Sequence, residues 1–227
     1  MGVHLPKRTA KAEAIDARNR HLSILQDVEK WCVQSNAGKE GFFYLSAIPI
    51  IYSAWEGYFR ITCAICLRRL CMRGTPVKKY DGKYATLWLQ KEGFLEAFLR
   101  ALINSMTLGK DNRKINAGRF NALTSFTDSI NNWFESPLNH SSNFDELVMT
   151  YSNVNADVAR LNGNIIGLNL SGVDFSKLDE MLGRRNDISH GGLISYPQES
   201  VVTGLLVYTI NLINQFGAAV DTWLEST

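Results

Sequence analysis

The stretch "GFFYLSAIPIIYSAW", residues 41–55, is an uncharged run of 15 residues, and Glu56 ends it. As a helix rising about 1.5 Å per residue, it is too short to cross the hydrocarbon core of a bilayer. An uncharged run of this length is typical of a helix buried in a protein core. We therefore expect a long central helix from Phe42 to Met72, with Pro49 as a site for a kink because proline removes a helix hydrogen bond.

Apolar residues elsewhere recur with the helical period of 3.6, and alternating β-branched runs are nearly absent. The sequence therefore predicts an all-α bundle with long central helices. The other helices are expected at Lys11–Cys32, Ala85–Ser105, Asn121–Phe134, Phe144–Asn162, Leu178 to the glycines at 191–192, and Glu199–Leu224.

The ends and faces of these helices follow from local signals. The first helix is expected to bury Ile15, Leu22, Leu25, Val28 and Cys32. Polar and basic residues predict loops at 73–83 and 108–119. Ser176 or Asp174 is expected to cap the helix that begins near Leu178, because both side chains accept hydrogen bonds from backbone N–H groups.

The composition is that of an ordinary globular protein. Of 227 residues, 45% are hydrophobic and 20% are charged, and the net charge of +2 gives no strong field toward nucleic acid or an anionic membrane. The four cysteines do not form a disulfide framework, and the N-terminal segment lacks the apolar core of a signal peptide. We expect a single all-α domain over residues 1–227, located in the cytoplasm and without membrane contact.

The segment "LGRRNDISHGG", residues 182–192, is hardest to explain as scaffolding. Two arginines, an asparagine and a histidine gather where an apolar helix should stop. The structural interpretation is helix capping. Basic side chains near a helix C-terminus stabilise the helix by about 0.3 to 1 kcal/mol each, and a glycine commonly ends a helix. The alternative is that Arg185 and His190 perform chemistry.

The pattern Arg-Asn-x-Ile-small-His-Gly in this segment resembles the motif of the HEPN superfamily of α-helical ribonucleases, in the RiboL-PSP or MAE-type branch. The segment "YSAWEGYFR", residues 52–60, is similar to the long core helix of that branch. The resemblance extends from about residue 41 to about residue 225. The helix expected at about residues 11–32 precedes it. It implies a HEPN-like helical bundle.

The resemblance implies that Arg185 and His190 are the catalytic pair and that Asn186 supports them. Arg184 could be the motif arginine in place of Arg185, and the sequence does not decide between the two. HEPN ribonucleases are generally metal-independent homodimers whose two motifs face one cleft, and they typically cut RNA by attack of a 2′-hydroxyl on the adjacent phosphate. No cofactor and no metal are therefore expected, and RNA is the expected substrate.

The chemistry fits these residue types. Histidine populates both protonation states near neutral pH, so it suits a general base or acid, and arginine can hold a phosphorane. However, Arg185 and His190 would lie about 140° apart on a straight helix. Either the helix frays before Gly191, or the arginine reaches around the helix or to a partner protomer, and dimerisation is the favoured interpretation.

Glu56 is a supporting candidate, because a lone carboxylate in an apolar helix must be paired or functional. It can pair with Arg60 one turn away or bond to the motif region, where the resemblance implies that it positions Arg185 or Arg184. Cys63 and Cys66 are expected to be buried thiols rather than zinc ligands.

Arg113, Lys114 and Arg119 are the expected RNA-binding residues, since basic side chains bind phosphates without reading bases, although a solvated loop explains them equally well. The predicted function is a metal-independent endoribonuclease in bacterial defence or a toxin–antitoxin pair, with an antitoxin or defence protein as a partner. The alternatives are a non-catalytic helical module that binds RNA, a nucleotide or a protein, and an oligomerising scaffold.

Overall fold

The computed structural model describes residues 5–34, 40–72, 74–106, 112–138, 143–151, 153–192 and 195–227. Their contacts group into two compact units. The larger unit is built from His4–Leu70 and Asn143–Thr227, and the smaller is built mainly from Cys71–Ser142. The single domain expected over residues 1–227 stays a prediction.

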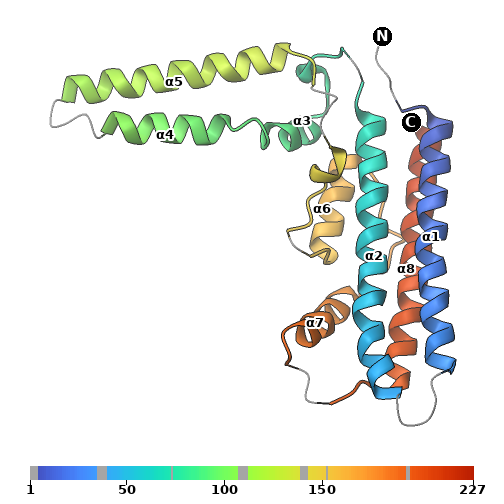
Figure 1. Ribbon diagram of the computed structural model, residues 1–227. Coiled ribbons are helices and arrows are strands. Elements are labelled where there is room, and N and C mark those ends of the chain that lie inside the picture. Colours follow the sequence, from blue (N-terminus) through green and yellow to red (C-terminus); the bar gives the residue numbers. More distant parts are fainter. Residues whose placement is uncertain are drawn as a thin grey trace. The chain divides into compact units, whose positions relative to one another are not determined.

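The all-α fold class is confirmed (Figure 1). The larger unit contains α1 (Lys7–Gln34), α2 (Glu40–Leu70), the 3₁₀ turn η2 (Phe144–Glu146), α6 (Ala156–Ile166), α7 (Leu178–Ser189) and α8 (Glu199–Ser226). The smaller unit contains the 3₁₀ turn η1 (Val77–Lys79), α3 (Gly82–Leu89), α4 (Phe94–Met106) and α5 (Asn112–Glu135). In the described residues the only β-type pairing is an isolated bridge between Pro76 and Pro137.

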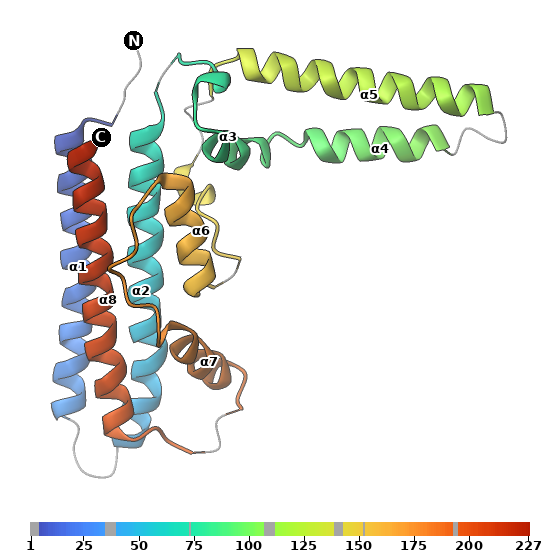
Figure 2. The same ribbon diagram turned by 180° about the vertical axis from the view of Figure 1, so that it is seen from behind.

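Helices α1, α2 and α8 lie side by side and contact one another (Figure 1, Figure 2). Trp55 and Phe59 of α2 pack their rings against Phe216 of α8, with centroid distances of 5.6 Å and 5.4 Å. All three side chains are fully buried, and large aromatic rings contribute strongly to core stability. The predicted central helix is thus confirmed, and it continues through Pro49.

The buried face of α1 differs from the prediction. Leu25 and Val28 are buried as expected, but Ile15 is exposed. The buried face instead begins with alanines, Ala10, Ala14 and Ala17. Because alanine has a small side chain, this face lets α1 approach its neighbours closely, and a stripe based on large apolar residues could not identify it.

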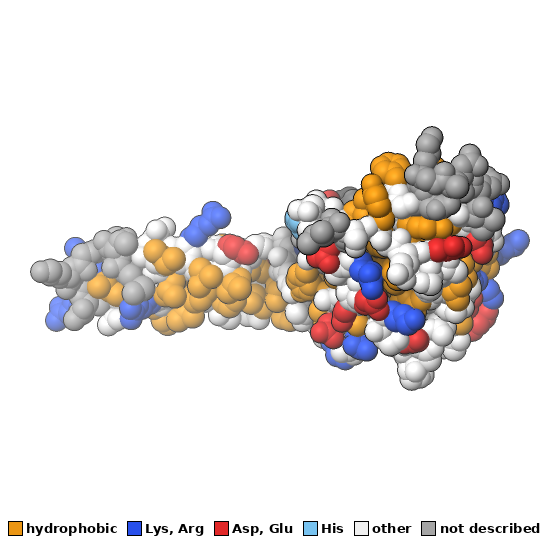
Figure 3. Space-filling view, turned by 90° about the horizontal axis from the view of Figure 1, so that it is seen from below, with side chains coloured by type: hydrophobic (Ala, Val, Ile, Leu, Met, Phe, Trp, Pro, Cys, Tyr) orange, Lys and Arg blue, Asp and Glu red, His pale blue; other side chains and the backbone are white. Residues whose placement is uncertain are grey.

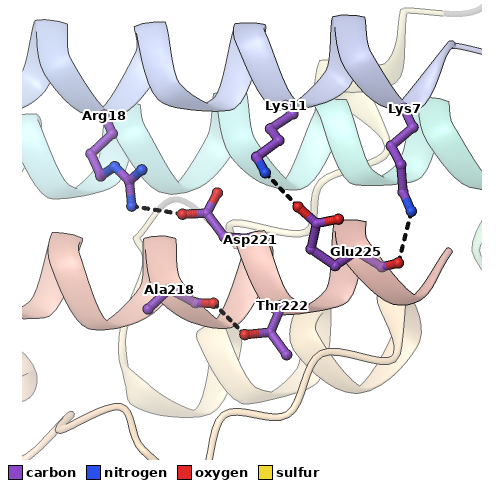
Figure 4. Close-up of polar contacts among 7 residues, drawn as sticks. All are labelled: Lys7, Lys11, Arg18, Ala218, Asp221, Thr222 and Glu225. Atoms are coloured by element: carbon purple, nitrogen blue, oxygen red, sulfur yellow. Dashed lines mark hydrogen bonds and ion pairs between the residues drawn. The ribbon is translucent and has the colours of Figure 1, made fainter.

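Ion pairs connect α1 to the last turns of α8 (Figure 4). Arg18 pairs with Asp221 at 3.1 Å, Lys11 pairs with Glu225, and Lys7 donates to the Glu225 backbone carbonyl at 2.7 Å. The Lys11–Glu225 pair is solvent-exposed and contributes little to stability. The Lys7 bond also places a positive charge at the C-terminus of α8, where the helix dipole favours it.

Two predictions for the smaller unit are wrong. The helix expected over Ala85–Ser105 is two helices, because the chain turns between α3 and α4 and Gly93 has a φ of +66°, a conformation that glycine adopts at low cost. The loop expected at 108–119 is helical from Asn112 onward, as the first part of α5. Residues 107–111 lie outside the described residues.

Two predictions for the larger unit are also wrong. The helix expected over Phe144–Asn162 is the 3₁₀ turn η2 followed by a separate helix, α6. Asn155 caps α6 by accepting a hydrogen bond from the Val158 N–H at 2.9 Å, and such side-chain bonds compete with helix continuation. The N-cap of α7 is Lys177 without a side-chain bond, while Asp174 accepts from the Ser176 N–H in the preceding turn.

Helix α8 is long and apolar enough to cross a membrane by length and composition alone. Half of its most apolar window is buried inside the bundle. The core helix of a water-soluble bundle meets the same criteria, so this property is weak evidence for a membrane span.

Candidate functional site

The motif segment forms the second half of α7 and its C-terminal stop. His190 is the C-cap residue, and its N–H still bonds the Asn186 carbonyl at 2.9 Å. Gly191 has a φ of +71°, and the N–H of Gly192 bonds the Asp187 carbonyl at 2.8 Å. This is the Schellman arrangement, in which a left-handed residue turns the chain back over the last carbonyls. The helix therefore ends in an ordered turn directly after His190.

Arg185 points toward α2 and is half-buried. Its guanidinium carbon lies 5.4 Å from the ring centroid of Tyr52. One guanidinium nitrogen, Nη1, donates to Asn186 Oδ1 at 2.9 Å and to Asn153 Oδ1 at 3.3 Å. Among the described residues Arg185 makes no ion pair. An aromatic face and two neutral amides thus hold the guanidinium, and they leave its charge without a direct counterion.

Tyr52 and Asn153 are site residues that the sequence analysis missed. The Tyr52 hydroxyl accepts a hydrogen bond from the Val154 N–H at 2.7 Å, which ties the segment before α6 to α2. Burial raises the pKa of Tyr52 to about 12, so the hydroxyl stays neutral at physiological pH. Tyr52 could have been predicted from its spacing to Glu56, which lies one helical turn later, because residues four apart share a helix face. Asn153 had no local signal.

Replacing Tyr52 with Phe is expected to destabilise the protein by about 1 to 2 kcal/mol, because the buried Val154 N–H loses its acceptor. The ring beside Arg185 is kept in this variant. Chemical denaturation of both proteins measures the change. Tyr196→Phe is the matched control, since Tyr196 is exposed and its hydroxyl should contribute less than about 0.5 kcal/mol. Equal stability of Tyr52→Phe and the wild type would contradict the role of this bond.

Glu56 lies on α2 one turn after Tyr52 and is half-buried. Burial raises the pKa of its carboxyl group, while Arg185 and, more weakly, Arg60 lower it. In the described residues neither arginine makes an ion pair with Glu56. Its interaction with both is therefore a longer-range attraction, and the attraction to Arg185 is the stronger of the two.

A Glu56→Gln substitution is expected to change how stability depends on pH. Because the folded-state pKa of Glu56 is raised, the protonated carboxyl favours folding at low pH, and that contribution is lost as pH rises through the folded-state pKa. Relative to the wild type, the glutamine variant should thus gain thermal stability between about pH 4 and pH 7. Melting temperatures of both proteins across this range measure the effect. A difference that does not vary with pH would contradict it.

His190 and Arg184 lie apart from this cluster. The His190 side chain is exposed, and Arg184 forms an exposed pair with Glu180 one turn earlier, at 2.9 Å. The ordered helix end means that fraying does not bring His190 to Arg185. No hydrogen bond joins these two side chains in the described part of the chain. Within one protomer the helix therefore directs the arginine inward and leaves the histidine at the surface.

The basic residues predicted to bind RNA belong to the other unit. The sequence predicted a loop here, but Arg113, Lys114 and Arg119 lie on the helix α5 of the smaller unit. All three side chains are exposed. Arg185 and His190 belong to the larger unit. The role of Arg113, Lys114 and Arg119 in RNA binding stays a prediction.

The described residues contain no group of three or more His, Cys, Asp or Glu side chains that could hold a metal ion. Cys63 and Cys66 are buried on α2, and burial raises the pKa of both thiols. A thiol with a raised pKa is a poor nucleophile and a poor metal ligand, because both reactions need the thiolate. These two cysteines pack as small apolar side chains.

The sequence model of the RiboL-PSP-HEPN family matches residues 12–226, which extends the predicted resemblance to include most of α1. Comparison with curated proteins and with solved structures finds no match. Because the family match spans nearly the whole chain, from α1 to the end of α8, the protein belongs to the RiboL-PSP-HEPN family.

Proposed function

We propose that this protein is a metal-independent endoribonuclease of HEPN type that cuts RNA by attack of a 2′-hydroxyl on the adjacent phosphate. The observation that carries the proposal is the setting of Arg185. Its guanidinium is half-buried, held by Tyr52, Asn153 and Asn186, and has no direct counterion in the described residues. A positioned cation of this kind can bind the negative charge that gathers on the non-bridging phosphate oxygens in the transition state.

In the proposed reaction, the 2′-oxygen forms a bond to phosphorus and the bond from phosphorus to the 5′-oxygen breaks. The 2′-hydroxyl gives its proton to a base, and the departing 5′-oxygen receives a proton from an acid. His190 acts as one of these groups, because a histidine side chain can accept or donate a proton near neutral pH. Arg185 stabilises the pentacoordinate phosphate. The products carry a 2′,3′-cyclic phosphate and a 5′-hydroxyl.

Arg185 rather than Arg184 is the proposed motif arginine. Arg184 is engaged in a pair with Glu180, whereas Arg185 is fixed by groups that do not neutralise its charge. Asn186 orients Arg185 through its side-chain oxygen, and Glu56 adds an attraction that helps to hold the guanidinium in place.

The proposed catalytic unit is a homodimer in which His190 of one protomer meets Arg185 of its partner. The opposite directions of the two side chains on α7 favour this arrangement. It is tested by mixing two inactive variants, His190→Ala and Arg185→Ala, after unfolding and refolding them together. Random pairing should restore about a quarter of the wild-type activity, because half of the dimers are mixed and each mixed dimer has one intact site. No recovery would contradict a site shared between protomers.

The test of the function itself is incubation of purified protein with total RNA in excess EDTA. We expect cleavage, with products that carry 2′,3′-cyclic phosphate ends. Products with 3′-hydroxyl ends, or cleavage that requires an added divalent metal, would contradict the mechanism. RNA incubated in the same buffer without protein gives the background.

The proposed setting is bacterial defence or a toxin–antitoxin pair in the cytoplasm, with an antitoxin or defence protein as partner. Arg113, Lys114 and Arg119 are proposed to bind RNA phosphates. Expression in growing cells tests this setting. The wild type is expected to arrest growth, whereas Arg185→Ala should not.

A second candidate function is a non-catalytic module that binds RNA, a nucleotide or a protein through the same surface. The observation that favours it is the separation of His190 from Arg185 within one chain. This function predicts RNA binding that persists in His190→Ala, without cleavage by the wild type. Cleavage by the wild type would exclude it.

A further inference from the structure

The segment between η2 and α6 is held at two points by buried side chains. Asn162 bonds both backbone groups of Met149: its Oδ1 accepts from the Met149 N–H at 3.1 Å, and its Nδ2 donates to the Met149 carbonyl at 2.7 Å. At the other point, the Val154 N–H donates to the Tyr52 hydroxyl at 2.7 Å. Asn162 and Tyr52 are both buried, so the short turn between Met149 and Val154 starts and ends at fixed positions.

Tyr151 lies in this turn with a backbone conformation that its side chain disfavours. Its φ is +44°, and in the described part of the chain no other residue except glycine has a positive φ. The Asn153 N–H closes the turn by bonding the Thr150 carbonyl at 2.7 Å. A left-handed backbone brings the Cβ of an L-residue close to a carbonyl oxygen, and it persists only where surrounding contacts impose it. A glycine would suit this position better for folding alone.

The ring of Tyr151 is exposed to solvent. Its exposed fraction is 66%, and its hydroxyl donates to Met149 Sδ at 3.2 Å. A side chain this exposed adds little to the core, so packing does not explain a tyrosine at a strained position. Exposed aromatic rings are common platforms for the bases of single-stranded nucleic acids, because every base has a flat face that can stack.

The same turn also supplies a side chain to Arg185. Asn153 Oδ1 accepts from Arg185 Nη1 at 3.3 Å, and Asn186 Oδ1 accepts from the same nitrogen at 2.9 Å. Because a guanidinium only donates, both amide oxygens face it and both amide NH₂ groups point elsewhere. Within the described residues these NH₂ groups bond to no protein atom, and neither do Nε and Nη2 of Arg185. Unpaired donors gathered around a cation suit a phosphate.

Charge alone gives the larger unit little hold on RNA. Figure 3 shows acidic and basic side chains interspersed on this unit, at the right of the view. Among the described side chains on this face there is therefore no broad basic surface of the kind that binds nucleic acid without stacking. A contact to a base would supply affinity that the charges do not.

We propose that the turn carrying Tyr151 and Asn153 binds the RNA strand and selects unpaired RNA. Asn153 Nδ2 and the free edge of Arg185 bind the oxygens of the scissile phosphate, and the Tyr151 ring stacks on the base of a neighbouring nucleotide. Tyr151 and Asn153 are two residues apart, so their Cα atoms are separated by at most about 7 Å, and one short stretch of RNA can reach both.

Bases within a duplex are already stacked on one another, so their faces are closed to the ring. The inferred substrate class is therefore single-stranded RNA. This inference rests on the proposed function, because it uses the phosphate site at Arg185.

The first test measures binding of a fluorescein-labelled, single-stranded 2′-fluoro RNA decamer to the full chain by fluorescence anisotropy. This probe lacks the attacking hydroxyl, so binding is measured without cleavage. Tyr151→Gly is expected to raise the dissociation constant by about 5- to 100-fold, as the loss of one base stack predicts. Its melting temperature should not fall, because glycine adopts a positive φ at low cost. Tyr151→Phe keeps the ring and should bind within about twofold of the wild type.

Phe42→Ala is the matched control, since Phe42 is exposed to a similar degree on α2 and has no proposed contact with RNA. It should bind the probe as the wild type does. Wild-type affinity in Tyr151→Gly would overturn the proposal. A lower melting temperature in Tyr151→Gly would also overturn it, because the side chain would then serve the fold.

The second test uses Asn153→Asp with the same probe. The carboxylate has the shape of the amide, but it would pair with Arg185 and repel phosphate, so the dissociation constant should rise by about 10-fold or more. A purely structural role predicts the opposite, since the new ion pair would hold Arg185 at least as well. Asn155→Asp is the matched control, because it adds the same charge two residues later and aspartate keeps the N-cap of α6. Equal affinity of both variants would overturn phosphate binding by Asn153.

The third test compares the single-stranded probe with the same probe annealed to its complement. The wild type is expected to bind the single strand at least about 10-fold more tightly, and Tyr151→Gly should lose most of this preference. Equal affinity of the wild type for both forms would overturn the selection of unpaired RNA. A wild type that binds neither form would overturn the whole inference.

These results are separable from the test of the proposed function. A wild type that binds the probe through Tyr151 and Asn153 but does not cleave RNA supports the binding turn and contradicts the endoribonuclease. Cleavage by the wild type, with unchanged probe binding in Tyr151→Gly and Asn153→Asp, contradicts the binding turn and leaves the endoribonuclease in place.

Discussion

His190→Ala is expected to lower the rate of RNA cleavage by about 10²- to 10⁴-fold, which is the range that a positioned general acid or base contributes. The substitution should leave the fold intact, because His190 is exposed and the stop of α7 is made by Gly191 and Gly192. Single-turnover cleavage of a defined RNA measures the rate, and melting temperatures verify the fold.

The matched control for this variant is Asp187→Ala, an exposed position on the same helix that has no proposed role in catalysis. Added imidazole should restore part of the rate in His190→Ala, since it can transfer the proton in place of the lost side chain. A His190→Ala variant that cleaves RNA at the wild-type rate would remove the histidine from the mechanism.

Arg185→Lys is expected to reduce cleavage by about 10²- to 10³-fold, although the charge is kept. Lysine presents a point charge on a flexible stem, and it cannot reproduce the planar fork that donates to Asn186 and Asn153. RNA binding should weaken less than catalysis, because the Coulombic attraction to phosphate persists. The rate at saturating protein and the dissociation constant, measured separately, distinguish these effects.

Arg184→Lys is the matched control, since Arg184 is the adjacent arginine and pairs with Glu180. It should cleave RNA at nearly the wild-type rate. The reverse result, with Arg184→Lys inactive and Arg185→Lys active, would assign the motif to the other register. Full activity of both variants would contradict arginine stabilisation of the phosphate.

The sequence predicted the long helices of the core well and the shorter elements poorly. The helix expected at Glu199–Leu224 is α8, and the expected central helix is α2, because many apolar residues at the helical period make their signal strong. The break before α4 depends on the conformation of Gly93. Within polar segments, side-chain caps such as that of Asn155 decide where a helix begins, and the hydrophobic pattern carries no such information.

For the site, the motif named Arg185, Asn186 and His190 as neighbours on one helix but did not predict their surroundings. Asn153 lies in an irregular segment whose own pattern indicates nothing beyond a turn. Its contact with Arg185 exists because the Tyr52 hydroxyl anchors the neighbouring Val154 N–H to α2. Such a contact depends on the packing of three separate segments, so no local pattern encodes it.

The sequence by itself determined that the chain is helical, that its motif ends a helix at two glycines, and that it resembles the HEPN superfamily. These properties depend on residues close together in the chain, since helix period and capping are local. Only the tertiary structure decided that α1 buries its alanines and that Arg185 turns toward Tyr52 while His190 stays exposed. The face that a helix buries is chosen by neighbours that arrive from distant parts of the chain, and their shape and polarity appear only when they pack together.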